Sequence, residues 1–450
     1  MQNSESPARD IMTNRRIMID GYNLALERGT GVATYSRNLS LELSKLGHKI
    51  DLLYGLRTST GTNPLLNEVN FFDPVTKSPK TMDVAKTLLR SPMGLKAREV
   101  PITGKVIARH PTRILPPYDR IFNYQHLFTV ARWHFKVYGK FMETSYERPA
   151  EIAHWTYPLP IRLKHAQNIY TIHDLVPLRL PYTTLDNKKE YFRVARDIAR
   201  DADHIVTVSE ASKRDIVDLL GVPEEKVTNT YQSVSLPSAI LERPFDEVAT
   251  EVEAIFGLEP KKYFLFFGAI EPKKNVGRII EAYLASQSRY PLVVVGQLTW
   301  KDANDLRLLG VSGQSGGKKT VDPSISAVSR AQQIIRLEYL PLNMLASIIR
   351  CARTVVFPSL YEGFGLPILE AMQLGTGVIT GTEGSNPEVS GDSAYLVDPY
   401  DVGAIARAIR DMQHDDDMVA HYEAAGRERA KLFSPERYSE RLTELYKKLK

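Results

Sequence analysis

The sequence is poor in cysteine and has no long apolar run. Cys351 is the single cysteine among 450 residues, so no disulfide can form within the chain, which is typical of a reducing compartment. No apolar run approaches the roughly 20 residues that a membrane-spanning helix requires. The first ten residues are polar and lack the apolar core of a signal peptide. We therefore expect the protein in the cytoplasm.

A strong charge of one sign and a metal-ligating cluster are also missing. The formal net charge is +5, and no dense stripe of lysine and arginine dominates the whole chain, so nucleic-acid binding is not expected. Cysteine and histidine do not cluster at metal-ligand spacing, so neither a metal nor another cofactor is expected. Hydrophobic residues make up 43% of the chain and charged residues 25%, which indicates a globular protein that is neither disordered nor membrane-spanning.

The length and the order of the apolar segments predict two α/β domains, because 450 residues are too many for one ordinary core. In the first half, strands are expected at 16–20, 49–54, 152–156, 169–173 and 204–208, and helices at 32–46, 187–200 and 210–219. In the second half, strands are expected at 263–267, 292–295, 334–338, 354–357, 378–379 and 395–397, and helices at 276–285, 342–351, 368–374 and 402–412. Such alternation builds parallel sheets that bind ligands at the carboxyl ends of their strands.

Residues 57–144 break the alternation, and we interpret them as an insertion on the first domain. Aromatic and basic residues are interleaved in its last part. The aromatic ones are Phe122, Tyr124, Phe128, Trp133, Phe135, Tyr138 and Phe141. Such a segment suits the surface of an anionic membrane, where each basic group near lipid contributes about 1 kcal/mol. A helix packed on its own domain with a solvated basic face explains the pattern equally well.

The strongest local signal is the segment 357–370, which reads FPSLYEGFGLPILE. A buried strand leads into a Gly-Phe-Gly turn and then a helix with Pro367 in its first turn. Free backbone amides at such a helix start favour phosphate and also bind sugar hydroxyls. Glu362 precedes the turn and Glu370 lies about one helical turn inside it, so both carboxylates can accept hydrogen bonds from a sugar and a ribose. The structural alternative makes them ordinary turn and helix-face residues.

A second signal is a basic turn after the expected strand 263–267. Gly268 ends the strand, and Lys273 and Lys274 precede the next helix. Two ammonium groups at a helix start are disfavoured by the helix dipole by roughly 0.3–1 kcal/mol. Their presence therefore favours an anionic ligand such as a pyrophosphate, although two solvated surface lysines would look the same.

A third signal is the pair His173 and Asp174 at the end of the expected strand 169–173. At the carboxyl end of a parallel strand such a pair faces the cleft and can polarise substrate hydroxyls. A lone histidine in this position is more often a hydrogen-bonded structural group, so the pair does not establish a site by itself.

Together these segments resemble glycosyltransferase family 4, the retaining enzymes with the GT-B fold, over nearly all of the chain outside 57–144. The string EGFGLPILE matches the family's motif of two glutamates separated by seven residues, and GAIEPKKN resembles its G-x-x-E-P-R-K-N loop with Lys273 in place of arginine. Gly31 matches the glycine of the first-domain loop that lets substrate approach the backbone. The strings TIHDLVPL, VTVSEASKRDI and FSPERYSERLTELYKKL are similar to bacterial polysaccharide and lipopolysaccharide members. Tyr231 begins a departure, because YQSV replaces the usual Asn-Gly-Val.

The resemblance implies an α/β GT-B fold, in which two Rossmann-like, doubly wound domains face each other across a cleft. Residues 1–240 would form the acceptor-side domain, with the insertion at about 57–144. Residues 241–432 would bind the nucleotide sugar, and 433–450 would form a C-terminal helix that crosses back to the first domain.

The resemblance also implies retention at the anomeric carbon without a covalent enzyme intermediate. Lys273 and Lys274 would stabilise the leaving diphosphate, Glu370 would hold the ribose, and Glu362 would orient the sugar. The expected catalytic residues are His173, Glu362 and Lys274; the expected acceptor-binding residue is Asp174; and the expected donor-binding residues are Gly31, Gly268, Lys273, Lys274, Glu362, Gly363, Phe364, Gly365, Leu366 and Glu370.

Mannosyl-transferring relatives are the most similar, which implies GDP-mannose as a substrate and a role in cell-surface polysaccharide or lipopolysaccharide synthesis. The acceptor would be a saccharide or a lipid-linked saccharide, met at the inner face of the membrane. Two other functions remain open: a nucleotide-sugar epimerase, which needs no acceptor, and a non-catalytic subunit that binds sugar nucleotide. Lys273 favours the second of these, since lysine keeps the charge of arginine but loses its bidentate geometry.

Overall fold

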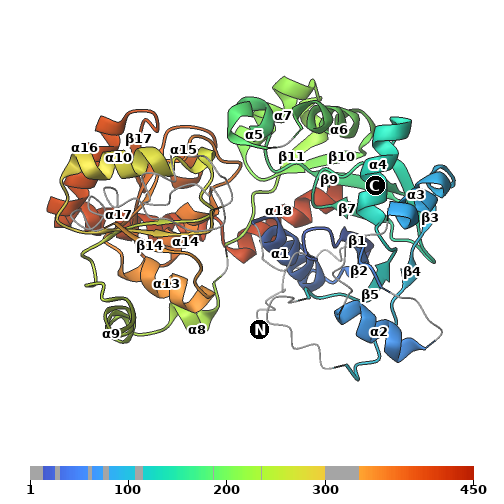
Figure 1. Ribbon diagram of the computed structural model, residues 1–450, viewed down its shortest axis with the longest axis horizontal. Helices are drawn as coiled ribbons and strands as arrows, with labels where there is room; N and C mark the ends of the chain where they lie inside the picture. The colour runs from blue at the N-terminus through green and yellow to red at the C-terminus, as the bar shows by residue number, and fades with distance from the viewer. Residues whose placement is uncertain are drawn as a thin grey trace, which may run out of the picture.

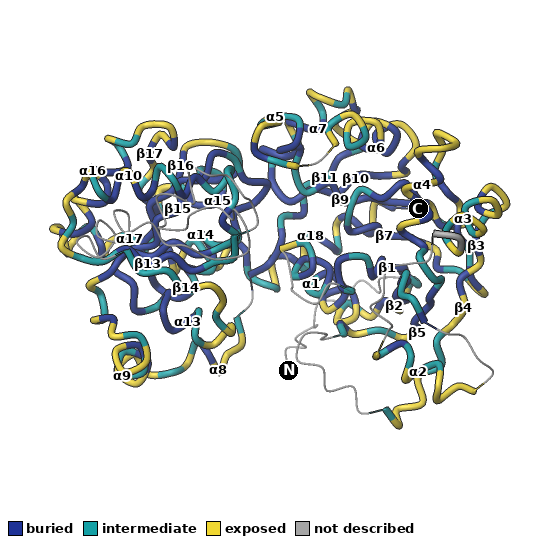
Figure 2. Tube along the Cα trace, viewed as in Figure 1, coloured by how far each residue is buried: buried dark blue, intermediate teal, exposed yellow. Residues whose placement is uncertain are grey.

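The computed structural model describes residues 14–25, 31–58, 63–73, 81–106, 115–185, 187–234, 236–298 and 334–449. Within them the chain forms two large sheets and one small one, and the large sheets lie in separate halves of the molecule (Figure 1). The central strands of both large sheets are buried, whereas exposed residues gather on the surrounding helices and loops (Figure 2). This is the distribution that parallel sheets covered by helices require.

The first large sheet has the strand order β11-β10-β9-β7-β1-β2-β5-β4, and only β4 runs antiparallel to its neighbour. Its strands are β1 (Arg16–Asp20), β2 (Lys49–Tyr54), β4 (Arg98–Glu99), β5 (Arg120–Asn123), β7 (Ile152–Trp155), β9 (Gln167–Thr171), β10 (His204–Thr207) and β11 (Val227–Asn229). The chain moves outward from β1 in one direction and from β7 in the other. A doubly wound sheet has its ligand crevice at such a reversal.

The helices of this half are α1 (Gly31–Lys45), α2 (Pro64–Phe72), α3 (Thr81–Arg90), α4 (Leu127–Tyr138), α5 (Val176–Arg179), α6 (Lys188–Asp201) and α7 (Glu210–Leu220), with the short 3₁₀ turns η1 (Ser91–Met93), η2 (Pro181–Thr183) and η3 (Glu224–Lys226). The small sheet consists of β3 (Leu95–Lys96), β6 (Met142–Ser145) and β8 (Ile161–Leu163). Ser209 caps the start of α7, because its side chain accepts a hydrogen bond from the amide of Ser212.

The second large sheet is wholly parallel, in the order β14-β13-β12-β15-β16-β17. Its strands are β12 (Phe264–Phe267), β13 (Leu292–Val295), β14 (Ile334–Leu337), β15 (Thr354–Phe357), β16 (Gly377–Gly381) and β17 (Tyr395–Val397). The winding reverses between β12 and β15. The loop after β12 contains Lys273 and Lys274, and the loop after β15 contains Glu362. The reversal therefore brings the basic turn and the glutamate motif, which are far apart in the sequence, to one place.

The remaining helices are α8 (Ser238–Leu241), α9 (Phe245–Phe256), η4 (Pro272–Lys274), α10 (Val276–Ser286), α13 (Leu342–Cys351), α14 (Leu366–Gln373), α15 (Asn386–Ser390), α16 (Val402–His414), α17 (Asp416–Lys431) and α18 (Pro435–Lys448). In Figure 1, α10 and α16 lie on one side of the second sheet and α9 and α13 on the other. Helices therefore cover both faces of this sheet.

The C-terminal helix α18 lies among the elements of the first half (Figure 1) and packs against α1. The Tyr446 hydroxyl is 2.7 Å from Nδ1 of the buried His154, and the Arg15 guanidinium donates to the carbonyl of Leu449 at 2.7 Å. These contacts join the end of the chain to its beginning. The exact division of the domains at residues 240 and 432 stays a prediction.

The interpretation of all of residues 57–144 as an insertion needs correction. Strand β5 lies within this stretch and pairs in parallel with β2, so it belongs to the first large sheet. It has only four residues, and the Arg120 side chain at its start binds the buried carboxylate of Asp51 at 2.6 Å. Because a basic residue opens so short an apolar run, the periodicity of the sequence did not reveal this strand.

Candidate functional site

The basic turn is built on the carboxyl end of β12. Gly268 has φ +136°, a conformation that residues with a side chain rarely adopt, and η4 then carries both lysines. Asn275 ends the turn and donates through its side chain to the carbonyls of Pro358 and Pro399, at 3.0 and 2.6 Å. Since Pro358 follows β15, these bonds fix the basic turn to the end of the neighbouring strand.

The second loop leads from β15 into α14. Gly365 precedes the helix with φ +94°, and Pro367 lies in its first turn, as the sequence predicted. The Ser385 hydroxyl donates to the carbonyl of Glu362 at 2.9 Å, and the amide of Leu360 donates to the carbonyl of Lys273 at 2.8 Å. The two loops are therefore hydrogen-bonded to each other through their backbones.

Lys274 and Glu362 form a close ion pair, with Nζ and Oε1 2.6 Å apart and side chains 12% and 6% exposed. The Lys274 ammonium also lies 5.0 Å from the centre of the Phe357 ring. Lys273 is 3.6 Å from the Glu271 carboxylate. Burial lowers the pKa of Lys273, but Glu362, Asp174 and Glu271 more than offset that effect, so its pKa lies above the usual range. The Lys273 ammonium is therefore charged at neutral pH.

Glu370 lies on α14, within the first two turns of the helix. Burial raises the pKa of this carboxyl to about 7. Its carboxylate forms no ion pair or hydrogen bond with any other residue that the structure describes. Glu370 is partly exposed, so a carboxylate without a protein partner here is accessible to a ligand and is a candidate for binding one.

His173 follows β9, and its Nε2 is 2.9 Å from the carbonyl of Thr156. A carbonyl only accepts hydrogen bonds, so Nε2 carries the proton and Nδ1 is left as an acceptor. Burial lowers the pKa of His173, which keeps the ring neutral. The Thr156 hydroxyl in turn donates to the buried Asp20 at 2.8 Å, and the Tyr35 ring meets the imidazole edge-on at 4.8 Å.

The two domains touch at Gly363. The Ser212 hydroxyl of the first domain lies 2.9 Å from the carbonyl of His173 and 3.3 Å from that of Gly363. A Cβ added at Gly363 would lie 2.7 Å from the His173 carbonyl oxygen and 2.9 Å from Cβ of Asp174. Gly31 makes a second close approach, because its Cβ would lie 3.4 Å from the Leu366 side chain. These glycines allow the domains to approach closely.

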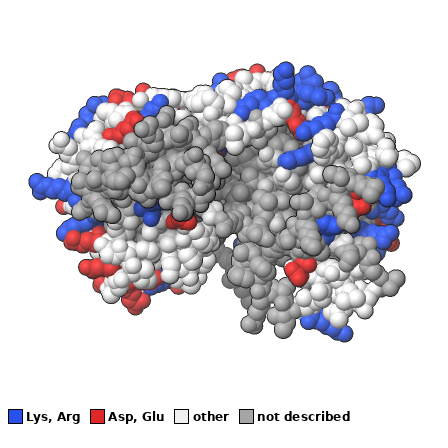
Figure 3. All heavy atoms as spheres, viewed as in Figure 1, with Lys and Arg blue, Asp and Glu red and all other residues white. Residues whose placement is uncertain are grey.

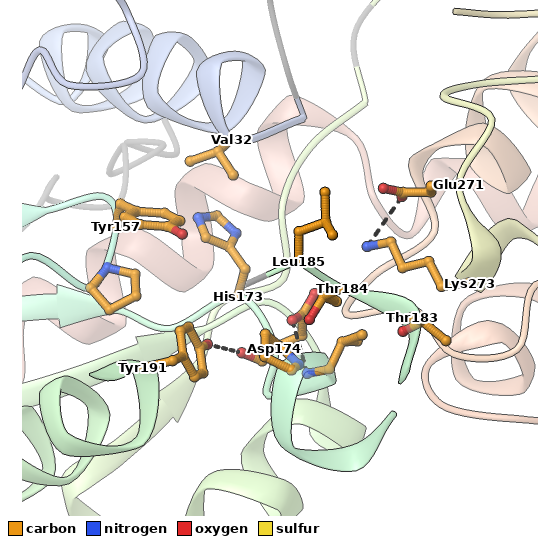
Figure 4. A pocket seen from close by; sticks show the side chains of 13 residues that line it. Val32, Tyr157, His173, Asp174, Thr183, Thr184, Leu185, Tyr191, Glu271 and Lys273 are labelled. Carbon is orange, nitrogen blue, oxygen red and sulfur yellow. Dashed lines mark hydrogen bonds and ion pairs between the residues drawn. The ribbon is translucent and has the colours of Figure 1, made fainter. Parts of the chain in front are cut away.

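A cavity of about 330 Å³ lies between the domains. The first domain contributes Tyr157, His173, Asp174 and Tyr191 to its lining, and Glu271 and Lys273 come from the second. Figure 4 shows the Lys273 ammonium and the His173 ring directed toward the space between the two domains. The cavity therefore combines aromatic surface, carboxylates and one buried cation.

The structure places the predicted residues in five positions. His173, Asp174 and Lys273 line the cavity, whereas Lys274 and Glu362 form the ion pair beside Lys273. The remaining residues are at the domain contact (Gly31, Gly363 and Leu366), at the end of β12 (Gly268), and at or on α14 (Gly365 and Glu370). The roles of all of them stay predictions.

Phe364 differs from the rest because its side chain is structural. Its ring is buried at 6.3 Å from that of Tyr231 and 5.6 Å from that of Phe433. Tyr231 has φ +55°, and the Arg441 guanidinium lies 4.7 Å from its ring. The unusual tyrosine of the YQSV segment thus packs between the end of the first domain and the C-terminal region.

Sequence reasoning missed several residues that line the cavity, including Tyr157, Tyr191 and Glu271. Glu271 belonged to the recognised GAIEPKKN string, so its position beside Lys273 offered a signal. Tyr157 follows a predicted strand, β7, where ligand-binding residues are expected. Tyr191 offered none, because it is one of two adjacent aromatic residues on an amphipathic helix.

We expect Gly363→Ala to lower the transfer rate about fivefold to tenfold, because the added methyl group meets first-domain backbone and the domains must separate by a few tenths of an ångström or more. Transfer assays on the purified variant measure the loss, and an unchanged melting temperature shows that the fold is kept. Gly403→Ala is the control, since its φ is not left-handed and a Cβ there meets only the ends of the exposed Asp401 and Arg407 side chains. Wild-type activity of Gly363→Ala would show that the close approach is not needed.

Comparison with known proteins decides the family. The family model described as Glycosyltransferase Family 4 matches residues 29–236, and that described as Glycosyl transferases group 1 matches residues 249–429. O-antigen chain mannosyltransferase B of Escherichia coli is 32% identical over 296 residues, which cover 65% of this chain and 72% of that protein. The chain belongs to glycosyltransferase family 4.

Other relatives agree with this assignment. O-antigen chain mannosyltransferase RfbU of Salmonella typhimurium is 25% identical over 56% of this chain and 62% of its own length. The structure of Anabaena HepE in complex with UDP and glucose superposes with a TM-score of 0.64 at 14% identity, over 97% of this chain and all of that one. The predicted GT-B α/β fold is confirmed, and the protein is a glycosyltransferase.

No helix of the described residues has both the length and the apolar character needed to cross a membrane. Nor do the described residues hold a group of three or more histidine, cysteine or acidic side chains in a metal-binding arrangement.

Proposed function

We propose that the protein transfers mannose from GDP-mannose to a saccharide or lipid-linked saccharide, with retention at the anomeric carbon, in the synthesis of a cell-surface polysaccharide. The observation that carries the proposal is the cluster of Lys273, Lys274 and Glu362 at the reversal of the second sheet, from which Lys273 faces His173 across the cavity. Relatives named as O-antigen mannosyltransferases support the choice of sugar.

The donor diphosphate would bind against the two lysines. As the bond between the anomeric carbon and the phosphate oxygen breaks, the diphosphate leaves with the electron pair, and Lys273 and Lys274 stabilise its added charge. The acceptor hydroxyl attacks the same face of the sugar and passes its proton to the leaving phosphate oxygen. Retention then needs no covalent intermediate on the protein.

The sugar would be held from both domains. Glu362 accepts from a sugar hydroxyl while it keeps Lys274 in place, and the backbone amides after Gly363 are free to donate at the start of α14. Nδ1 of the neutral His173 accepts from another hydroxyl. Because His173 is not charged, it orients the sugar and does not serve as a proton donor.

The acceptor would occupy the first-domain side of the cavity. Tyr157 and Tyr191 offer flat apolar surface for a sugar ring, and the Asp174 carboxylate offers an acceptor for its hydroxyls. The Asp174 backbone carbonyl already accepts from the Tyr191 hydroxyl at 2.8 Å, which holds that ring against the cavity. This arrangement supports an acceptor-binding role for Asp174.

Thermal-shift measurements against a panel of nucleotide sugars test the donor. A ligand at about 100 times its Kd stabilises the folded state by about 2.7 kcal/mol, so GDP-mannose should raise the melting temperature by several degrees and UDP-glucose should not. Product analysis then separates the alternatives. An isomeric nucleotide sugar formed without acceptor would indicate an epimerase, and donor binding without release of GDP would indicate a non-catalytic subunit.

A further inference from the structure

The first domain buries a carboxylate that has no cationic partner. Figure 3 shows lysine, arginine, aspartate and glutamate side chains on the outer surface of both domains, where water solvates their charges. Asp20 differs, because it is the last residue of β1 and is 0% exposed. It forms no ion pair with any other described residue, and burial raises its pKa to about 6. Since a buried charge without a partner of opposite sign is costly, this residue requires an explanation.

Three hydrogen bonds hold the Asp20 carboxylate where a cation is missing. The backbone amide and the hydroxyl of Thr156 both donate to Oδ2, the hydroxyl at 2.8 Å. The amide of Tyr22 donates to Oδ1 at 3.1 Å. Thr156 follows β7, which is the strand beside β1 in the sheet. Asp20 therefore fixes the backbone at the carboxyl end of the neighbouring strand.

The next contact in this chain reaches His173. The Thr156 carbonyl accepts from Nε2 of His173 at 2.9 Å, and His173 follows β9, which lies on the other side of β7. The contacts thus cross the ends of three adjacent strands, from β1 through β7 to β9. His173 lines the cavity, whereas Asp20 does not. Asp20 can therefore influence a bound sugar only through Thr156 and His173.

Helix α1 holds the same group from another side. The Ser36 hydroxyl lies 2.9 Å from Oγ1 of Thr156. Because the proton of the Thr156 hydroxyl is directed to Asp20, Oγ1 accepts from Ser36. With its amide and its hydroxyl both bonded to fixed partners, Thr156 presents its carbonyl to His173 in a single direction.

We propose that Asp20 is a positioning residue for sugar transfer: through Thr156 it holds the carbonyl that fixes the tautomer and the orientation of the His173 ring. A ring nitrogen bonded to a fixed acceptor keeps its proton, which leaves the other nitrogen free to accept. Nδ1 is then ready for a sugar hydroxyl before the donor binds. The inference rests on the proposed function, in which His173 orients the transferred sugar.

Removal of the carboxylate tests the positioning. Asp20→Ala leaves the amide and hydroxyl of Thr156 without their acceptor, so the carbonyl beside His173 is no longer held. We expect kcat with GDP-mannose to fall about tenfold to thirtyfold, while the Kd for GDP changes less than about twofold because the expected nucleotide site lies in the other domain. Asp20→Asn should keep at least about a third of the wild-type kcat, because its amide oxygen can still accept from Thr156.

Thr156 offers a second pair of variants, which stays informative if Asp20→Ala does not fold. Thr156→Val removes the hydroxyl that donates to Asp20 but keeps the branched shape of the side chain, whereas Thr156→Ser keeps the hydroxyl. We expect Thr156→Val to lower kcat about threefold to tenfold and Thr156→Ser to stay within about twofold of wild type. A purely structural hydrogen bond would change the melting temperature and leave the kcat of the folded protein unaltered.

The tautomer of His173 provides a readout that does not depend on activity. In protein with ¹⁵N-labelled histidine, His173 should show a protonated Nε2 and an unprotonated Nδ1, which are assigned by their loss in His173→Gln. Asp20→Ala and Thr156→Val should move the two nitrogen signals toward each other, because the second tautomer becomes populated.

Tyr170→Phe is the matched control. Tyr170 is 1% exposed on β9, the strand that leads to His173, and its hydroxyl donates to the carbonyl of Ile161 at 2.7 Å. The variant removes a buried hydrogen bond without altering any partner of Thr156. It should lower the melting temperature and leave both kcat and the His173 signals as in wild type.

The outcomes separate this inference from the proposed function. Wild-type His173 signals in folded Asp20→Ala overturn the inference. So do altered signals with an unchanged kcat, because transfer would then not need the fixed ring. Failure of the proposed function looks different: the wild-type protein would not turn over GDP-mannose, while the His173 signals would still respond to Asp20→Ala.

Discussion

Lys274→Ala is expected to lower the rate of sugar transfer about 10²–10³-fold, the usual loss when one preorganised donor to a developing negative charge is removed. The Lys274 ammonium is 12% exposed and lies at the reversal of the second sheet, where the diphosphate would leave. Its charge therefore acts in a partly water-excluded site, in which electrostatic stabilisation is larger than in bulk water. Release of GDP in single-turnover assays with purified, folded variant measures the effect.

Glu362→Ala should cost a similar factor, because the carboxylate both holds Lys274 at 2.6 Å and would contact the sugar. Two residues in direct contact do not act independently. The double variant Lys274→Ala/Glu362→Ala should therefore lose much less activity than the product of the two single losses. If the losses multiply, the ion pair is not the functional unit.

Lys262→Ala is the matched control. Lys262 lies on the same domain and pairs with Glu259, but both side chains are largely exposed. Exposed ion pairs contribute little, so this variant should keep wild-type turnover. If Lys274→Ala and Glu362→Ala also keep near wild-type donor consumption, the assignment of the site is wrong.

Local patterns were sufficient to predict most of the second sheet. Strands β13 and β15 and helix α13 begin and end where the apolar runs predict, because strands buried on both faces read as continuous apolar segments. The glycines and Pro367 also predicted the turn into α14 correctly, since these residue types suit a positive φ and a helix start. Such features depend on neighbours a few residues away.

Features that depend on distant contacts were not predictable in this way. Strand β5 is recognisable only through its pairing with β2. Arg120 of β5 and its partner Asp51 of β2 are 69 residues apart in the sequence. The bond between Lys274 and Glu362 spans 88 positions. Tyr191 reaches the cavity only because α6 packs where it does. Sequence periodicity does not show which residues far apart in the chain come into contact, because the packing of the folded domains determines these contacts.

Glu370→Ala is expected to weaken GDP binding about 10- to 100-fold, since a hydrogen bond to a charged group contributes about 1.5–3 kcal/mol and each 1.4 kcal/mol is a factor of ten. The carboxylate has no protein partner among the described residues, so the ribose hydroxyls would supply its hydrogen bonds. Isothermal titration calorimetry with GDP measures the loss, and Glu428→Ala on α17, which removes an exposed ion pair with Lys431, is the control.

The pH dependence distinguishes a ligand-binding carboxylate from a structural one. The folded-state pKa of Glu370 is about 7, above the ordinary value of 4.5, because of burial. Between these values the folded protein holds a proton that the unfolded chain has released, so the contribution of Glu370 to stability falls as the pH rises from 4.5 to about 7.

GDP affinity should change in the opposite direction. If the ionised carboxylate accepts from the ribose, affinity rises as the pH passes upward through about 7, and Glu370→Gln abolishes this rise. Bound nucleotide would also lower the pKa of Glu370, because hydrogen bonds from the ribose favour the charged form. A purely structural Glu370 would show the change in stability without any change in affinity, so the two measurements together assign its role.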